Sequence, residues 1–242
     1  MILFGLCILL LYTISVFGKG DLCFFSKDKV LPLKAILAIG IVLHHLSYEF
    51  GFLSEFHSLG PVLLSIFFFI SGYGLMRQFE NSRERYLAAF FKKRVLFAVL
   101  LPFIISAAVY FAVLQPDINI CYAIKVFFSS GNVIVPNSWF VFAILLYYIF
   151  FWLSCKLLNG KYVIAVLSVF TIAYILFTVS LGYARHWYIE ILVFPFGVIY
   201  SKYENKLQTI YMHKRIYMMV APVCLIAICL FYVLGVKYNE LY

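Results

Sequence analysis

Apolar residues occur along this chain in long runs that are separated by short polar segments. A helix of about 20 apolar residues crosses a hydrocarbon core of ~30 Å. The runs therefore predict an all-α fold, a polytopic transmembrane helix bundle with about eight spans. The shortest run needs flanking interfacial residues to complete its crossing. The predicted spans are residues 1–18, 33–51, 60–76, 95–114, 138–155, 162–182, 187–201 and 217–236.

The polar segments between the runs are short and carry few structural signals of their own. The longest, residues 115–137, contains CYAIKVFF, which includes Lys125 and is too short to span. It predicts an interfacial or re-entrant helix over the outer mouth of the bundle. Residues 1–18 lack a basic leading region and a small-residue cleavage site, so we interpret them as a retained span. Without a Pro/Ser-rich linker or a repeat, we expect residues 1–242 to form one transmembrane domain.

Composition agrees with a membrane protein and excludes a soluble globular domain. The chain has 242 residues, of which 65% are hydrophobic and 12% are charged, whereas a soluble domain carries about 25% charged residues. Its 19 tyrosines and 27 phenylalanines fit aromatic belts at the membrane interfaces. The six cysteines show no CxxC or zinc-type spacing, so we expect no metal site and no redox role.

The lysines and arginines lie mainly in alternate loops. Cytoplasmic loops of membrane proteins are rich in these residues, and the cytoplasmic leaflet is anionic. The pattern therefore predicts a multi-pass protein of the cell membrane with both termini outside. Nucleic-acid binding would require the charges on one soluble surface, so we expect the lipid bilayer as a partner and no nucleic acid. Only Lys125, Arg185 and Lys237 fall outside the set assigned to the cytoplasmic side, which is Lys19, Lys27, Lys29, Lys34, Arg77, Arg83, Arg85, Lys92, Lys93, Arg94, Lys156, Lys161, Lys202, Lys206, Lys214 and Arg215.

The second predicted span holds two titratable residues, Lys34 and His45, in a helical register that places them on one face. Eleven residues turn a helix to within about 20° of three full turns and advance it about 16 Å. Lys34 follows Pro32, which suits the first turn of a helix. Ionisable residues inside a span usually mark functional sites, and histidine exchanges protons near neutral pH. We expect His45 to be catalytic; the alternative is a histidine that hydrogen-bonds a neighbouring helix for packing.

The third predicted span contains the sequence FFFISGYG, residues 67–74. Glycine and serine allow helices to approach closely in lipid. Glycine pairs can also break a helix and expose backbone amides to a ligand. We therefore expect Ser71 and Tyr73 to bind substrate, and the alternative is a close helix crossing.

A basic run, Lys92, Lys93 and Arg94, precedes the fourth predicted span. These residues can serve only to set the orientation of the chain in the membrane. Together with Lys34 it can also bind a polyanion, such as a nucleotide phosphate group, at the cytoplasmic mouth.

Two residues of the later spans complete the candidate site. Glu190 lies twelve residues before Lys202, which gives it about the same height as His45 above the inner boundary. Two titratable groups at one depth can act as a base and its orienting partner; the alternative is a carboxylate paired with Arg185 or His186. Trp139 opens the fifth span, where it can belong to the interfacial belt or stack on a carbohydrate.

Four stretches, in this order, resemble acyltransferase family 3, which comprises multi-span membrane O-acyltransferases of bacteria and eukaryotes. They are a basic residue and a histidine separated by ten residues (Lys34 to His45), FFxxSGY (67–73), FFKKR (90–94) with a proline downstream, and SWF (138–140). The resemblance covers roughly residues 30–200.

The resemblance implies transfer of an acyl group, commonly acetyl, from cytoplasmic acyl-CoA to a hydroxyl of an extracytoplasmic glycan or lipid-linked sugar. It implies that His45 is the catalytic residue, as general base or as transient acyl carrier, and that Lys34 acts on the CoA side. Acyl-CoA would be the donor substrate, with no permanently bound cofactor. We expect a bacterial cytoplasmic membrane as the location.

The chain also departs from the family pattern. Lys34 stands where arginine is usual, and Ser65 stands where many members have aspartate. Members usually have more spans, so we expect a C-terminally short chain, which would be inactive if the acceptor half of the site is incomplete. The alternative function is a proton-coupled transporter or glycan flippase with Glu190 and His45 as a proton relay; the chain shows no inverted repeats that would favour it.

Overall fold

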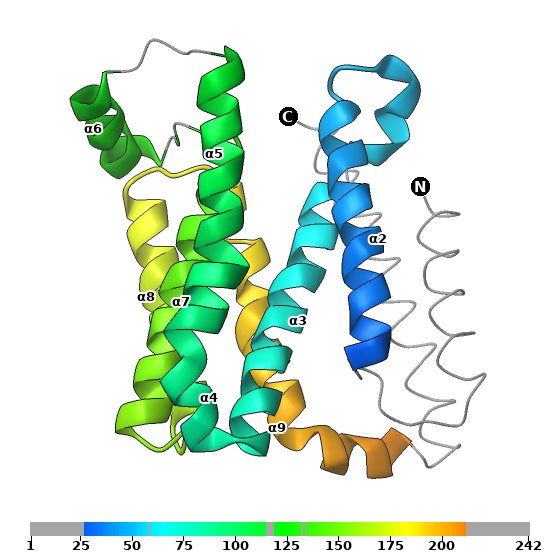
Figure 1. Ribbon diagram of the computed structural model, residues 1–242, viewed down its shortest axis with the longest axis vertical. Coiled ribbons are helices and arrows are strands. Elements are labelled where there is room, and N and C mark those ends of the chain that lie inside the picture. Colours follow the sequence, from blue (N-terminus) through cyan, green and yellow to red (C-terminus); the bar gives the residue numbers. More distant parts are fainter. Residues whose placement is uncertain (1–26, 58, 115–118, 132, 134, 212–242) are drawn as a thin grey trace. The chain divides into compact units, whose positions relative to one another are not determined.

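The computed structural model describes residues 27–211, except 58, 115–118, 132 and 134 (Figure 1). The predicted spans 1–18 and 217–236 lie outside the described residues. Residue contacts divide the chain into two compact units, 1–202 and 203–242, and the helices below belong to the first unit apart from the end of α9. The described helices are α2 (Lys27–Leu46), η1 (Gly51–Phe56), α3 (Gly60–Asn81), α4 (Arg83–Phe90), η2 (Phe91–Leu100), α5 (Leu101–Leu114), α6 (Ile120–Ser130), α7 (Trp139–Leu157), α8 (Val163–Ser180), η3 (Arg185–Trp187), η4 (Glu190–Leu192) and α9 (Val193–Tyr211).

The described part of the chain is all helical, which confirms the predicted fold class. Four of its helices are long and apolar enough to cross a membrane, namely Gly60–Asn81, Arg83–Leu114, Trp139–Leu157 and Val163–Ser180, and Val30–Leu46 is a shorter apolar helix. Successive long helices alternate in direction (Figure 1). The number of spans and the side of each terminus stay predictions.

Two predicted spans have other boundaries in the structure. The span predicted at 33–51 ends at Leu46, and a separate 3₁₀ helix follows at Gly51–Phe56. The span predicted at 187–201 begins as two 3₁₀ turns, and its α-helix starts only at Val193. The predicted short helix in the 115–137 segment is present as α6. Its N-cap residue is Asn119, whose side-chain oxygen accepts a hydrogen bond from the backbone N–H of Tyr122.

The segments α4, η2 and α5 form one uninterrupted helix from Arg83 to Leu114, and its centre is wider than an α-helix. Residues Phe91–Leu100 adopt π-helical hydrogen bonding. π-Helical turns are rare and occur frequently at functional sites. The basic run Lys92–Arg94 lies at the start of this wide segment, so its side chains follow a different angular spacing from an α-helix.

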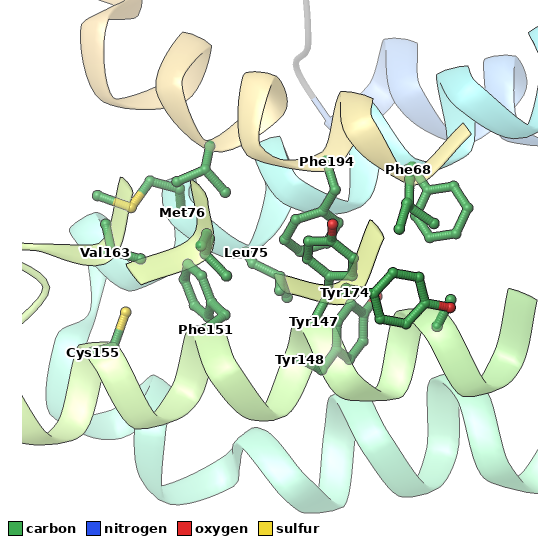
Figure 2. Close-up of a cluster of buried hydrophobic side chains, with 14 of the residues drawn as sticks. Phe68, Leu75, Met76, Tyr147, Tyr148, Phe151, Cys155, Val163, Tyr174 and Phe194 are labelled. Carbon is green, nitrogen blue, oxygen red and sulfur yellow. The ribbon is translucent and has the colours of Figure 1, made fainter. Parts of the chain in front are cut away.

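The core of the first unit is an aromatic cluster in which α7 contributes the central residues (Figure 2). Tyr147, Phe151 and Phe194 are fully buried. The Tyr147 hydroxyl and Thr171 Oγ1 lie 2.8 Å apart in a hydrogen bond between α7 and α8. Because an apolar environment leaves no water to satisfy a hydroxyl, this bond fixes the two helices in one register.

α2 packs against α3 through a smaller apolar cluster. Leu37 of α2 and Leu63 and Ile70 of α3 are buried there. Gly40 allows this approach, since a β-carbon at position 40 would lie 2.8 Å from the Leu63 Cδ1 atom. The contact fixes which face of α2 turns toward the bundle.

α3 and α9 touch backbone to backbone at two glycines. A β-carbon at Gly72 would overlap the carbonyl oxygen of Phe194, and one at Gly197 would overlap the carbonyl oxygen of Phe69. Gly72 belongs to the FFFISGYG stretch, so this stretch forms the close helix crossing that was the structural alternative for it. Small residues at such crossings allow the dispersion contacts that associate helices in lipid.

The crossing predicts opposite effects of alanine at neighbouring glycines. Gly72→Ala and Gly197→Ala each insert a methyl group into a backbone contact, and we expect each to destabilise the protein by about 1–3 kcal/mol. Thermal unfolding of the purified protein in detergent, followed by tryptophan fluorescence, measures the effect.

Gly74→Ala is the matched control, because a β-carbon at Gly74 meets no atom within 4 Å. Alanine is the better helix former by roughly 0.5–1 kcal/mol, so this variant should unfold at the same or a higher temperature. Equal melting temperatures for all three variants would contradict the proposed crossing.

Candidate active site

Helix α2 carries Lys34 and His45 in one continuous helix, as the register of eleven residues requires. The two side chains share one face about 16 Å apart along the axis. The expectation that Pro32 lies in the first turn is wrong, because α2 already includes Lys27 and Pro32 lies inside the helix. Lys34 is consequently more than one turn into the helix and half-buried, while His45 is exposed in the last turn.

His45 lies at the end of the bundle where α2 ends and α7 begins, which we call the histidine end. Its Nδ1 atom is 3.5 Å from Nδ2 of Asn137, a residue that precedes α7. Its ring centroid is 5.1 Å from that of His44. His44 itself contacts the carbonyl oxygen of Phe56 through Nδ1, at 3.2 Å, which agrees with a supporting role for His44 and leaves His45 as the more accessible ring.

Trp139 also lies at the histidine end, two residues after Asn137. Its side chain is only 7% exposed, and its ring centroid is 5.0 Å from that of His186 and 5.9 Å from that of Trp187. Partial burial lowers the pKa of His186, which favours the neutral ring. Trp139 therefore packs against the imidazole of His186, while His45 contacts Asn137, two residues before Trp139.

Glu190 is buried in the 3₁₀ turn η4, where α9 is about to begin. It is 4% exposed, and its Oε2 atom has no hydrogen-bond partner among the described residues. This oxygen is neither paired with Arg185 or His186 nor bound to His45, whose Nδ1 faces Asn137 instead. A buried carboxylate oxygen without a partner costs stability, and such a cost is typical of groups retained for binding or proton transfer.

The second group of candidate residues lies toward the other end of the bundle, where α3 and α7 end and α4 and α8 begin; we call it the basic end. Arg94 is half-buried, and its charge acts on Lys34 of α2. Its guanidinium carbon is 6.0 Å from the ring centroid of Tyr86, which lies one helical segment earlier. Two half-buried cations from different helices thus lie close enough to interact electrostatically, which suits an anionic ligand.

Ser71 connects to this group through Tyr148. The hydroxyls of Ser71 and Tyr148 share a hydrogen bond between α3 and α7, and Arg94 also acts electrostatically on Tyr148. Tyr148 is buried in the aromatic cluster (Figure 2). The structure therefore brings Ser71 and Arg94 to one tyrosine, and Arg94 also acts on Lys34.

Three candidate residues lie apart from this group. Lys92 and Lys93 are exposed at the start of the π-helical segment. Tyr73 is buried at the crossing of α3 and α9, where its ring centroid is 6.0 Å from that of Tyr200. These positions fit a surface role for the two lysines and a packing role for Tyr73.

Sequence reasoning missed three residues that contact the candidate site: Asn137, Tyr148 and Tyr86. Asn137 is joined to His45 across 92 positions of the chain, a separation that local patterns do not reveal. Tyr148 and Tyr86 occur in aromatic-rich segments where they look like ordinary core residues. One signal for Asn137 was present in the sequence, because it directly precedes Ser138 and Trp139 of the SWF stretch.

The helices and their polar groups define the class of this molecule as a polytopic helical membrane protein. A family profile described as "Acyltransferase domain" matches residues 33–242. Because this match covers most of the chain, the protein belongs to acyltransferase family 3. A comparison with curated proteins and one with solved structures find no significant match. The family makes the protein a membrane acyltransferase by class.

The unpartnered Oε2 atom of Glu190 predicts a separation of stability from activity. In Glu190→Met an apolar side chain of similar length replaces a buried carboxylate in which this one oxygen has no hydrogen-bond partner among the described residues. We expect thermal stability to be maintained or to rise by up to about 1–3 kcal/mol, while transfer of label from radioactive acetyl-CoA in membranes is lost.

Glu84→Met is the control, since Glu84 is exposed on α4 and its replacement should change neither quantity. A Glu190→Met protein that unfolds at a clearly lower temperature would instead show that the carboxylate stabilises the fold.

Proposed function

We propose that this protein transfers an acyl group, most simply acetyl, from acyl-CoA to a hydroxyl of an extracytoplasmic glycan or lipid-linked sugar. The observation that carries this proposal is the arrangement along α2. Lys34, on which the charge of Arg94 acts, lies toward the basic end, and the accessible His45 lies toward the other end on the same face of the same helix. A slender thioester substrate can extend between two such points.

At the basic end, Lys34 and Arg94 bind the phosphate groups of the donor. Arg94 offers planar donors for a bidentate contact, whereas Lys34 acts as a point charge. Lys92 and Lys93, which are exposed, raise the local concentration of an anionic substrate at this mouth. Ser71, held by Tyr148, offers a hydroxyl to the part of the donor that follows the phosphates.

At the histidine end, His45 acts as general base. Its Nε2 atom removes the proton of the acceptor hydroxyl as the oxygen attacks the thioester carbonyl carbon. The carbon–sulfur bond breaks, and the same proton is returned to the leaving thiolate. The exposed ring of His186 offers a polar edge to a sugar, and the nearly buried Trp139 packs against that ring. Glu190 offers its unpartnered oxygen to a hydroxyl or a proton.

The location follows from the same arrangement. The described helices carry most of their cations at the basic end, which we assign to the cytoplasm, where acyl-CoA is available. The histidine end then faces the cell exterior. We propose the bacterial cytoplasmic membrane as the site of action.

The proposal predicts that His45→Ala abolishes acyl transfer without unfolding the protein. Membranes containing each variant receive radioactive acetyl-CoA, and label in glycan and lipid fractions is counted. A general base contributes about 10²–10⁴-fold to a rate, so we expect a loss of this size. His57→Ala is the control: it changes another histidine at the histidine end and should keep wild-type transfer.

Variants at the basic end should instead alter donor binding. Lys34→Ala and Arg94→Ala should raise the KM for acetyl-CoA. Lys34→Arg should leave this KM near the wild-type value, because it keeps a positive charge at the same position of α2. Lys156→Ala, at an exposed cation of α7, is the control. Transfer that persists in His45→Ala would remove the proposed mechanism, and label retained covalently on His45 would indicate an acyl-histidine route in place of a general base.

A further inference from the structure

The contact between Asn137 and His45 joins an element of the site to a residue with no assigned role. The amide nitrogen Nδ2 of Asn137 lies 3.5 Å from Nδ1 of His45. This separation is at the long end for a hydrogen bond, and catalytic hydrogen bonds are often long before substrate binds. The contact engages Nδ1 and leaves the other ring nitrogen, Nε2, for a substrate.

The backbone around Asn137 holds this side chain in place. Asn137 has φ of 60°, in the left-handed region that asparagine tolerates better than most residues. The flanking turn is closed by two backbone hydrogen bonds, from Ser138 N to the Val135 oxygen (3.2 Å) and from Val141 N to the Ser138 oxygen (3.0 Å). Ser138 and Trp139 are buried. The amide is thus presented from a fixed turn to an imidazole on a different helix.

The amide can select which nitrogen of His45 carries the proton. A neutral imidazole has one N–H and one lone pair, and a partner at Nδ1 decides between the two tautomers. The amide NH₂ facing Nδ1 would place the proton on Nε2. After a half-turn of the amide, its carbonyl oxygen faces Nδ1, the proton stays on Nδ1, and Nε2 keeps its lone pair. The two amide orientations have nearly the same shape.

We infer that Asn137 is a positioning residue for His45: its amide oxygen accepts the Nδ1 proton, so that Nε2 is the basic nitrogen during acyl transfer. This inference rests on the proposed function of His45. When Nε2 takes the proton of the acceptor hydroxyl, the amide oxygen still accepts a hydrogen bond from Nδ1–H and stabilises the imidazolium. The imidazolium lasts until Nε2 passes its proton to the leaving thiolate. No further reactant is needed.

The electrostatic surroundings of His45 allow such a neutral partner to be effective. The titratable ring beside it on α2 is His44, at 5.1 Å between centroids, and the turn before α7 presents the uncharged Asn137 to its Nδ1 atom. Oε2 of Glu190 has no bond to the ring. Among the described contacts of the imidazole nitrogens, the amide is the one that orients it.

The test separates the side chain of Asn137 from its backbone. Asn137→Gly keeps the left-handed turn and removes the amide, and Asn159→Gly is the matched control, because Asn159 has φ of 55° in the turn between α7 and α8. Acyl transfer from radioactive acetyl-CoA is measured in membranes. We expect Asn137→Gly to lower kcat about 10- to 100-fold, as loss of a partner that orients a functional histidine does, with KM for acetyl-CoA unchanged. Asn159→Gly should keep wild-type kcat.

Asn137→Asp tests the positioning role through the pH dependence of the rate, which would not change if Asn137 had a purely structural role. The carboxylate keeps an acceptor oxygen at Nδ1, so activity should be retained to a large extent. Since a negative charge beside an imidazole stabilises its protonated form, the acid limb of the pH–rate profile should move to higher pH. Wild-type kcat in Asn137→Gly, or an unmoved profile in Asn137→Asp, would overturn the inference.

A spectroscopic measurement keeps the inference distinct from the proposed function. The ¹⁵N signals of His45 in labelled protein in bilayers, assigned by their absence from His45→Ala, report the tautomer directly. The wild type should hold the proton on Nδ1, and Asn137→Gly should give a mixture of tautomers. An unchanged tautomer overturns the positioning role whatever the activity, whereas persisting transfer in His45→Ala defeats the proposed function alone.

Discussion

The contact on which the arrangement of the first unit depends is the backbone crossing of α3 and α9. Gly72 and Gly197 each face a carbonyl oxygen of the other helix, so neither position can carry a β-carbon without separating the helices. This crossing fixes the orientation of α3 about its axis, and with it the directions in which Ser71 and Tyr73 project. It also sets where the 3₁₀ turn with Glu190 meets α3, since η4 packs on that helix. The candidate site is therefore built around a packing constraint.

The surrounding apolar core then decides where polar chemistry can occur. Hydroxyls within the bundle, such as those of Tyr147 and Thr171, satisfy one another, because unpaired polar groups in an apolar medium are costly. Cations gather toward one end, around Arg94, and imidazoles toward the other, around His45 and His186. Helix α2 spans the interval between them. This separation is what a reaction between a donor on one side of a membrane and an acceptor on the other requires.

The sequence predicts the elements well where periodicity and length are decisive. The runs at 60–76, 138–155 and 162–182 correspond to α3, α7 and α8 to within a few residues, and the register of Lys34 and His45 needs only helical geometry. The sequence does not reveal the π-helical form of Phe91–Leu100 or the 3₁₀ turns before Val193, because a run of apolar residues suits each of these conformations equally.

Long-range partners are the other part that sequence patterns leave open. Gly197 is a single glycine in an apolar run, and only the packed structure shows that it meets α3 opposite Gly72. Asn137 likewise becomes a candidate site residue only through its contact with His45, 92 positions away in the chain. By contrast, the family membership was visible beforehand, because four short stretches in a fixed order specify it and the profile match over 33–242 confirms it.

The central claim is that acyl groups pass from the basic end to the histidine end across the membrane. Sealed inverted vesicles, with the basic end outward, test it most directly. Radioactive acetyl-CoA is added outside, and labelled glycan or lipid is then exposed to an esterase that cannot cross the membrane. The account predicts label that resists the esterase until detergent opens the vesicles. Label that the esterase removes from sealed vesicles would contradict it.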